Sequence, residues 1–386
     1  MMENTVNENL KELLEHLLDV LDSDRQDKIE NLYRQTLNWE HVDRLPVIVT
    51  LSSPHELQFV PYPHGQVFQN PEKMLFNELV YAFNTSIASR DVLADDLPCT
   101  IRANFGTVII ASMFGACVEQ VGDNPPWIRH DNDKNISLEQ VLDHDPVDFS
   151  KGCCPRVVEM CQFYENVLSD YPELKSLIKL VLPDLQGPFD NLELTVGSDV
   201  FIELYQNQDL VYKALEAMTT AQIGFAQHLV QYISETSNTF SHQHATMIKG
   251  RILLRNDSVI MMSPAMYRNL IASHDEHVLR ELGGGGIHSC GKIEDHIPAF
   301  LELPSIRCLD LGQPELNDVN SIYIELKQRR IPLTRLKVSR EDLATARIMA
   351  RFPTGVSLLY EADSVLDAKE TIQAYLRATE KKDYVQ

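Results

Sequence analysis

Apolar and polar residues alternate along this chain with the periods of helices and of buried strands in turn. Leucines at positions 10, 13, 14, 17, 18 and 21 share one helical face, which predicts an amphipathic helix over residues 7–38. Short apolar runs then alternate with longer amphipathic segments as far as residue 377. Such short runs are typical of strands that are covered on both faces, as in a parallel sheet.

The predicted elements follow one another as strand, helix, strand over most of the chain. Strands are predicted at residues 45–50, 98–106, 177–182, 239–244, 258–262, 286–290, 306–311, 331–338 and 355–360. Helices are predicted at residues 71–89, 199–205, 209–235, 292–302, 318–328, 340–351 and 364–377. Residues 121–148 are rich in Asp, Pro and Asn and are predicted to form a long surface excursion. No internal repeat or glycine-serine linker interrupts this alternation, which indicates the α/β class.

Composition and charge narrow the class of protein. With 386 residues, 44% of them hydrophobic, the chain can bury a large core. Its net charge of -22, from 56 acidic and 34 basic residues, argues against nucleic acid or an anionic membrane as partner. No apolar run approaches the roughly 20 residues of a membrane span, and the N-terminus lacks the basic start of a signal peptide. We therefore expect a cytoplasmic protein, in which the odd set of seven cysteines stays reduced.

One short segment carries the clearest chemistry. Four glycines at positions 283–286 lead into His288, Ser289, Cys290 and Gly291. In a strand, residues i and i+2 face the same way, so His288 and Cys290 should project together. Imidazole and thiolate are among the ligands that zinc binds best. Because a helix and another strand are predicted next, the pair falls at the carboxyl end of its strand.

Several stretches of this sequence resemble the uroporphyrinogen decarboxylase superfamily, which includes zinc methyltransferases that work with corrinoid proteins. The longer ones are LRNDSVIMMSPAMYRNLI at 254–271, GGGGIHSCG at 283–291 and CLDLGQPELND at 308–318, and shorter ones lie at 43–47, 104–106 and 186–189. The resemblance implies a (β/α)8 TIM barrel over residues 41–386, with its active site at the carboxyl ends of the strands. Residues 1–40 would be an N-terminal helical extension. Nine predicted strands exceed the eight places of such a barrel, so one of them, such as 258–262, must be something else.

The resemblance also implies a zinc site with three protein ligands. His288 and Cys290 would be two of them, and they are also predicted as catalytic residues. The family's third ligand is a cysteine near the end of the last strand, but no cysteine follows Cys308 in this chain. Asp363 falls at that place and Glu361 lies two residues earlier, so Asp363 is the predicted third ligand, with Glu361 or Cys308 as alternatives.

Other polar residues near predicted strand ends are further candidates for the site. Asp257 lies where the family tends to have an acidic site residue, and it is predicted to be catalytic. His242 and His244 should share one face of a strand, where they would either bind metal or form a polar layer within the barrel. The predicted substrate-binding residues are Asn104, His242, His244 and Gln313.

Together with the His288–Cys290 pair, the resemblance implies a zinc-dependent methyltransferase. It would transfer a methyl group between a small substrate or thiol and a separate corrinoid protein. Zinc can lower the pKa of a bound thiol, so that a nucleophilic thiolate persists at neutral pH. The corrinoid must come from another protein, because a sequence that begins like the corrinoid-binding Asp-x-His-x-x-Gly element at Asp275 ends in Arg280 instead of glycine.

Two other functions remain open at this stage. Uroporphyrinogen decarboxylase itself needs arginines for the carboxylates of its substrate, and members of that family carry them in the loop after the first strand. Here that loop, residues 50–55, contains no arginine. A barrel that binds a small ligand without catalysis is the third hypothesis, in which His288 and Cys290 merely pack inside the barrel.

Overall fold

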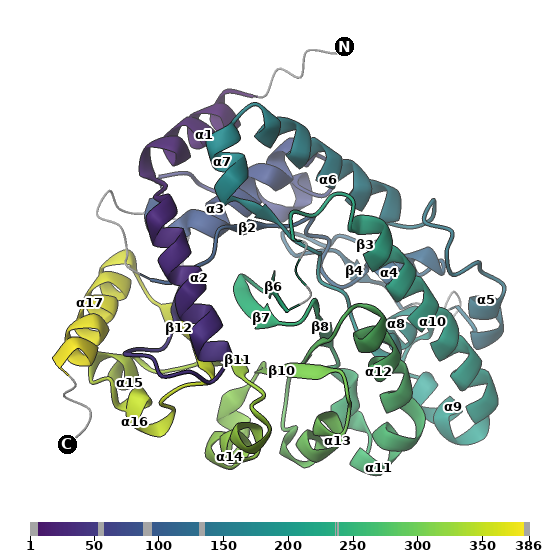
Figure 1. The fold of residues 1–386 in the computed structure, drawn as a ribbon. Coiled ribbons are helices and arrows are strands. Elements are labelled where there is room, and N and C mark those ends of the chain that lie inside the picture. The colour runs from purple at the N-terminus through teal and green to yellow at the C-terminus, as the bar shows by residue number, and fades with distance from the viewer. Residues whose placement is uncertain are drawn as a thin grey trace.

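A six-stranded parallel sheet forms the centre of the structure, with helices around it (Figure 1). The computed structural model describes residues 7–52, 58–87, 95–130, 136–235, 237 and 239–381. The strand order is β1-β12-β11-β10-β9-β8. These strands are β1 (Val47–Leu51), β8 (Ile252–Arg255), β9 (Gly285–Ser289), β10 (Ile306–Leu311), β11 (Leu333–Lys337) and β12 (Val356–Ala362). Because the strands are parallel, all their carboxyl ends lie at one edge of the sheet.

Helices link successive strands, which confirms the α/β class. The helices are α1 (Glu8–Val20), α2 (Ser23–Leu37), α3 (Pro71–Ile87), α4 (Ile109–Met113), α5 (Leu138–Leu142), α6 (Cys154–Ser169), α7 (Pro172–Leu177), α8 (Pro188–Val196), α9 (Val200–Gln206), α10 (Gln208–Leu229), α11 (Pro264–Met266), α12 (Ala272–Glu281), α13 (Ile297–Leu301), α14 (Val319–Arg329), α15 (Arg340–Ala344), α16 (Arg347–Arg351) and α17 (Val365–Lys381). Over the described ranges, none of them is both long and apolar enough to cross a bilayer. All seven cysteines are free thiols.

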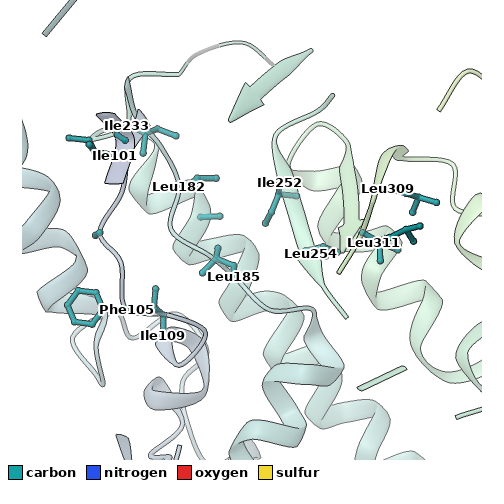
Figure 2. Close-up of a cluster of buried hydrophobic side chains, with 14 of the residues drawn as sticks. Ile101, Phe105, Ile109, Leu182, Leu185, Ile233, Ile252, Leu254, Leu309 and Leu311 are labelled. Carbon is teal, nitrogen blue, oxygen red and sulfur yellow. The ribbon is translucent and has the colours of Figure 1, made fainter. Parts of the chain in front are cut away.

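Buried aliphatic and aromatic side chains fill the space between the strands and the helices. Figure 2 shows part of this core, to which Ile101, Leu182, Leu254 of β8 and Leu311 of β10 contribute buried side chains. The buried leucines of α1 belong to the same cluster. Strand residues can be apolar on both faces here, because one face of the sheet packs against helices and the other face is covered by buried side chains.

The remaining strands are short. β2 (Thr100–Ile101) pairs in parallel with β5 (Lys179–Leu180), whereas β3 (Val118–Glu119) and β4 (Trp127–Ile128) are antiparallel. The predicted strands at 98–106 and 177–182 are therefore much shorter than expected. After β2, the side chains of Arg102 and Asn104 bond to carboxylates of other elements.

Residues 239–244 do not form a strand of the parallel sheet, contrary to the sequence prediction, and residues 258–262 are the surplus strand candidate that is something else. β6 (Phe240–Gln243) pairs with β7 (Thr246–Lys249) as an antiparallel hairpin. Residues Ser258–Met261 form a 3-10 helix. The start of that helix is held by the carboxylate of Asp190, which accepts hydrogen bonds from the backbone N–H groups of Asp257 and Ser258. Apolar content alone could not distinguish this turn from a strand.

Two predicted helices are interrupted. The first divides into α1 and α2 because Leu21 is extended and the Asp22 carboxylate caps the second helix by accepting from Asp24 and Arg25. The helix predicted at 292–302 is a 3-10 turn, Glu294–His296, followed by α13, which has Pro298 in its first turn. The predicted excursion at 121–148 contains β4 and α5.

Candidate functional site

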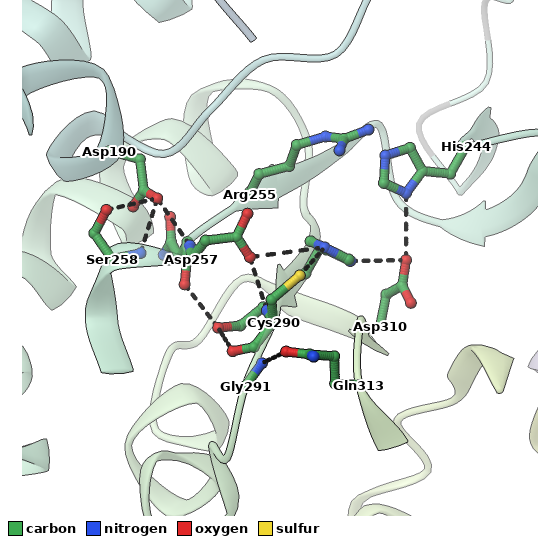
Figure 3. A network of polar contacts seen from close by, with 12 residues as sticks. Asp190, His244, Arg255, Asp257, Ser258, Cys290, Gly291, Asp310 and Gln313 are labelled. Carbon is green, nitrogen blue, oxygen red and sulfur yellow. Dashed lines mark hydrogen bonds and ion pairs between the residues drawn. The ribbon is translucent and has the colours of Figure 1, made fainter. Parts of the chain in front are cut away.

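His288 and Cys290 lie together at the carboxyl end of β9. Cys290 lies beside Asp257, which is in the loop that follows β8 (Figure 3). Sγ of Cys290 is 3.6 Å from Nε2 of His288. The nearer carboxylate oxygen of Asp257 is 3.8 Å from the same nitrogen. These three donor atoms all lie within 4.8 Å of one another, which is the spacing of groups that can hold one metal ion.

The other nitrogen of His288 faces a buried carboxylate. Nδ1 of His288 is 3.1 Å from Oδ2 of Asp310, the residue opposite it on the neighbouring strand β10. Burial lowers the pKa of His288, but the negative charge of Asp310 outweighs this and raises the pKa to about 10. Asp310 therefore fixes the orientation of the ring, and Nε2 is left to face Cys290 and Asp257.

The loop that carries Asp257 is held by α8. Oδ1 of Asp190, in the first turn of that helix, accepts hydrogen bonds from the N–H groups of Asp257 (2.8 Å) and Ser258 (3.0 Å). Oδ1 of Asp257 in turn accepts a hydrogen bond of 2.7 Å from the backbone N–H of Cys290. The carboxylate of Asp257 is thus tied to the backbone of the residue whose thiol it approaches.

Gln313 supports the same segment from the other side. Its Oε1 accepts a hydrogen bond of 2.8 Å from the N–H of Gly291. Nδ2 of Asn317 donates to the carbonyl oxygen of Gly291 at 2.9 Å. The loop after β10 therefore positions the turn after Cys290, and in this structure the Gln313 amide oxygen is occupied by backbone.

A cavity of about 650 Å³ opens in front of the His288–Cys290 pair. Its polar lining comes from several strand ends and includes Glu78, Arg102, Asn104, Asp184, His244, Arg255, His288, Cys290, Asp310, Arg335, Lys337 and Glu361. Asn104, a predicted substrate-binding residue, lies on this wall and donates a hydrogen bond of 2.9 Å to Oε1 of Glu78. The cavity is large enough for a small-molecule substrate.

The sequence analysis did not predict that three arginines lie together in this cavity. Arg102 follows β2, Arg255 ends β8 and Arg335 lies in β11. Asp184 accepts from Arg102 and from Arg255, each at 2.7 Å. Burial would raise the pKa of Asp184, but the two guanidinium groups hold it well below its usual range. The only sequence signal for this cluster is that each arginine lies within or directly after a predicted strand or apolar run.

The predicted pair of histidines is separated by a turn. His242 is buried, with its Nδ1 2.5 Å from Oε1 of Glu235 and its Nε2 3.7 Å from Glu30, and it does not line the cavity. His244 has a φ of 53° in the hairpin turn and does line the cavity. Its Nδ1 lies 2.5 Å from Nη1 of Arg335. The expectation that the two histidines share a face is therefore wrong, because the strand ends between them.

His244 is a neutral histidine in a charged environment. Burial, followed by the charge of Arg255, lowers its pKa to about 3. Together with His288 and Asp310 it forms a second group whose ligand atoms lie within 4.8 Å of one another. The second group shares His288 with the first but uses the side of the ring that faces Asp310.

The three candidates for a further metal ligand lie in different places. Asp363 is exposed, its N–H donates to Asp367, and it belongs to neither group of potential ligands. Glu361 lines the cavity and pairs with Lys337 at 2.6 Å. Cys308 is fully buried, and burial raises the pKa of its thiol to about 12. The carboxylates that the structure brings to His288 are those of Asp257 and Asp310.

Comparison with known proteins is informative at the level of structure. No protein-family model matches the sequence, and no curated protein matches it. A solved structure described as a methyltransferase from Methanosarcina mazei is similar, with a TM-score of 0.62 and 14% sequence identity. The match covers 92% of this chain and 98% of that one. At this identity the likeness concerns the fold.

Proposed function

We propose that this chain is a zinc-dependent methyltransferase whose metal is held by His288, Cys290 and the carboxylate of Asp257. The observation that carries the proposal is the convergence of one thiol, one imidazole and one carboxylate, of which the thiol and the imidazole also line the cavity. Ligands of a tetrahedral zinc ion lie about 3.3–3.8 Å apart, given bond lengths of about 2.0–2.3 Å. The separations of 3.6 and 3.8 Å around Nε2 of His288 fit such an ion.

The residues around these three ligands have supporting roles. Zinc bound there would lower the pKa of a substrate thiol, so that a thiolate could accept a methyl group at neutral pH. Asp310 holds the His288 ring through Nδ1, as carboxylates commonly do behind a ligating histidine. Asn104 and His244 also line the cavity wall, and they would orient the rest of a small substrate.

The fold can be read as a closed (β/α)8 barrel. Strands β1, β2, β5 and β8 to β12 would be its eight strands in chain order, with the β6–β7 hairpin as an insertion. Two contacts outside the named strands support this closure. The N–H of Asp96, shortly before β2, donates to the carbonyl of Val47 at 2.8 Å, and Gln186, after β5, forms a parallel bridge with Arg255. The structural likeness to the methyltransferase also supports it.

The methyl group would travel on a separate corrinoid protein in the cytoplasm. Arg280 stands where a corrinoid-binding element of this chain would need glycine. The cavity lies at the carboxyl ends of the strands, where barrel enzymes admit their substrates. A carrier protein docked over this end would bring the methyl group to the cavity that His288 and Cys290 line.

Metal content is the first test. Protein purified without chelator should contain about one zinc per chain by elemental analysis. The double variant His288→Ala, Cys290→Ala should contain almost none, because it removes two of the three ligands. Cys308→Ser, which changes a buried thiol outside the ligand group, should keep its metal. Full zinc content in the double variant would contradict the proposed site.

Methyl transfer is the second test. The protein should transfer a methyl group between a methylated corrinoid protein and a small thiol, and the chelated protein should not. Re-addition of zinc should restore the rate in the wild type but not in the double variant. Transfer that survives complete removal of metal would contradict the proposed role of zinc.

Uroporphyrinogen decarboxylation is the second candidate, and the three cavity arginines favour it. Cations that could bind the substrate's carboxylates come from Arg102, Arg255 and Arg335, whereas the loop after the first strand has no arginine. Residues 53–55 of that loop lie outside the described structure. Each of them already faces a buried carboxylate, Asp184 or Asp310. We therefore expect the purified protein to leave uroporphyrinogen unchanged. Efficient decarboxylation in the presence of chelator would reverse the order of the two candidates.

A further inference from the structure

A second cavity lies at the opposite end of the sheet from the candidate metal site. It has a volume of about 470 Å³ and lies beside Ile306, the first residue of β10. His288 is paired with Asp310 near the other end of the same strand. The carboxyl end of α13 and the end of α14 also line it, through Leu301 and Arg329. Both helices lie at the lower edge of Figure 1.

Four basic side chains line this cavity, which we call the basic cavity. They are Lys249, Arg307, Arg329 and Arg330. Among the residues that the structure describes, none of the four forms an ion pair with a carboxylate. Glu302 is the acidic residue of the lining, and it pairs with Arg268 at 2.8 Å. Such a concentration of positive charge is unexpected in a chain with a net charge of -22.

The two arginines nearest α13 are anchored at one end only. Nη1 of Arg307 donates to the carbonyls of Pro304 (2.8 Å) and Ile306 (2.9 Å). Nη1 of Arg329 donates to the carbonyl of Leu301. Leu301 is the last residue of α13, and the helix dipole stabilises a cation near the carboxyl end of a helix, which accounts for the contact of Arg329. Within the described structure, Nε and Nη2 of both guanidinium groups make no hydrogen bond.

The position of Lys249 in the basic cavity is not explained by a contact with the carboxyl end of a helix. It closes β7, it is half-buried, and its ammonium group has no hydrogen-bond acceptor among the described residues. Burial, followed by the charges of Arg330 and Arg307, lowers the pKa of Lys249. A bound anion would stabilise the charged form of Lys249, because it would offset the repulsion by Arg330 and Arg307.

We propose that the basic cavity binds a small molecule that carries a phosphate or diphosphate group. The free Nε and Nη2 edges of Arg307 and Arg329 match two oxygens of a phosphate, while Lys249 supplies a point charge. The site is a cavity and not a flat stripe, which favours a small molecule. The strongly acidic remainder of the chain would repel a nucleic acid.

Calorimetric titration with inorganic pyrophosphate tests the proposal on the metal-loaded protein at constant ionic strength. Wild-type protein should bind it saturably, and Lys249→Gln and Arg307→Gln should each weaken binding at least about 10-fold, since each removes a charge-assisted contact. Arg347→Gln is the matched control, because Arg347 is exposed, pairs with Glu341 and lies outside the cavity. Its affinity should equal that of the wild type.

A gain of affinity provides an independent test if the first two variants fold poorly. Glu302→Gln removes the acidic side chain of the lining and should bind pyrophosphate several-fold more tightly. ADP and inorganic phosphate, titrated in parallel, distinguish a phosphate ester from the free anion, and preference for either supports the phosphate site. The proposal is overturned if wild-type protein shows no saturable binding, or if the cavity variants and Arg347→Gln bind equally.

Discussion

At the scale of single residues, the candidate metal site differs from the expected one in its third ligand. Asp363 was expected to complete it, whereas the carboxylate of Asp257 lies 3.8 Å from Nε2 of His288. We predict that Asp257→Ala lowers zinc affinity by at least about 10-fold, because it removes a ligand. Asp363→Ala should have little effect, since Asp363 is exposed and belongs to neither ligand group. Competition with a chromogenic chelator measures both, and the reverse order would restore Asp363 as the ligand.

A second residue-scale prediction concerns Asp275, which is buried behind the site. Its Oδ2 accepts hydrogen bonds from Nδ2 of Asn256 (2.5 Å) and from the hydroxyl of Tyr267 (2.8 Å). Burial raises the pKa of Asp275 to about 7, although both hydrogen bonds lower it. The folded state therefore binds this proton more tightly than the unfolded state, and stability should fall as pH rises from about 4 to about 7.

Asp275→Asn keeps both hydrogen bonds and removes the titration. Between pH 5 and pH 7, the wild type should lose about 2 kcal/mol of unfolding free energy more than the variant does. Urea unfolding at the two pH values measures this difference. Equal losses in the two proteins would mean that Asp275 ionises freely in the folded state.

At the scale of elements, the close approach of α8 to the loop after β8 is the sharpest constraint near the site. A Cβ atom on Gly187, the cap of α8, would lie 1.7 Å from Oδ1 of Asn256 and 2.8 Å from its Cγ. We predict that Gly187→Ala destabilises the protein by about 1–3 kcal/mol, because the helix or the loop must move. Urea unfolding measures this cost.

Gly65→Ala is the control for that substitution. The atom nearest to its added Cβ would be Oε1 of Gln120, at 3.2 Å, which is the end of a flexible side chain. Its effect on stability should be small. Because Asn256 directly precedes Asp257, Gly187→Ala should also weaken zinc binding. Normal zinc affinity in a destabilised Gly187→Ala protein would show that the contact with α8 does not position Asp257.

The sequence predicted those elements whose signal is local. Residues 306–311 form β10 as expected, and His288 and Cys290 lie together because a strand has a period of two. Residues 258–262 were the surplus strand of the sequence analysis, but the turn that they form could not be predicted, because it depends on Asp190, which is distant in sequence and bonds to the backbone there. The cavity arginines were missed for a similar reason, since they come from separate strands and meet only in the folded protein.

At the scale of the whole molecule, the N-terminal helices and the last strand of the sheet are directly connected. The N–H of Gly355, just before β12, donates to the carbonyl of Thr36 in α2 at 3.1 Å. Thr354 donates to the carbonyl of Glu40 at 2.6 Å, and the ring of Trp39 packs 5.4 Å from that of Tyr323. The first forty residues and the sheet should therefore unfold together.

Leu358→Ala tests this cooperativity. Leu358 is fully buried in β12, so truncation should cost about 2–5 kcal/mol. Trp39 is half-buried between α2 and the sheet, so in a Trp127→Phe background its fluorescence reports on the N-terminal part, whereas circular dichroism reports on all helices. Both signals should shift to the same lower midpoint. Ile324→Ala, which changes an exposed side chain, should shift neither, and separate midpoints in Leu358→Ala would indicate an independent N-terminal domain.

The pairing of β1 with β12 also determines when the sheet can be completed during translation. Val47 pairs with Leu358, so one side of β1 has no partner until nearly the whole sheet has been translated. At about 5–20 residues per second, a ribosome needs roughly 15–60 s to cover that interval. An unpaired strand edge is a template for aggregation during all of this time. Because β1 stays unpaired for so long, we expect chaperones to bind the nascent chain.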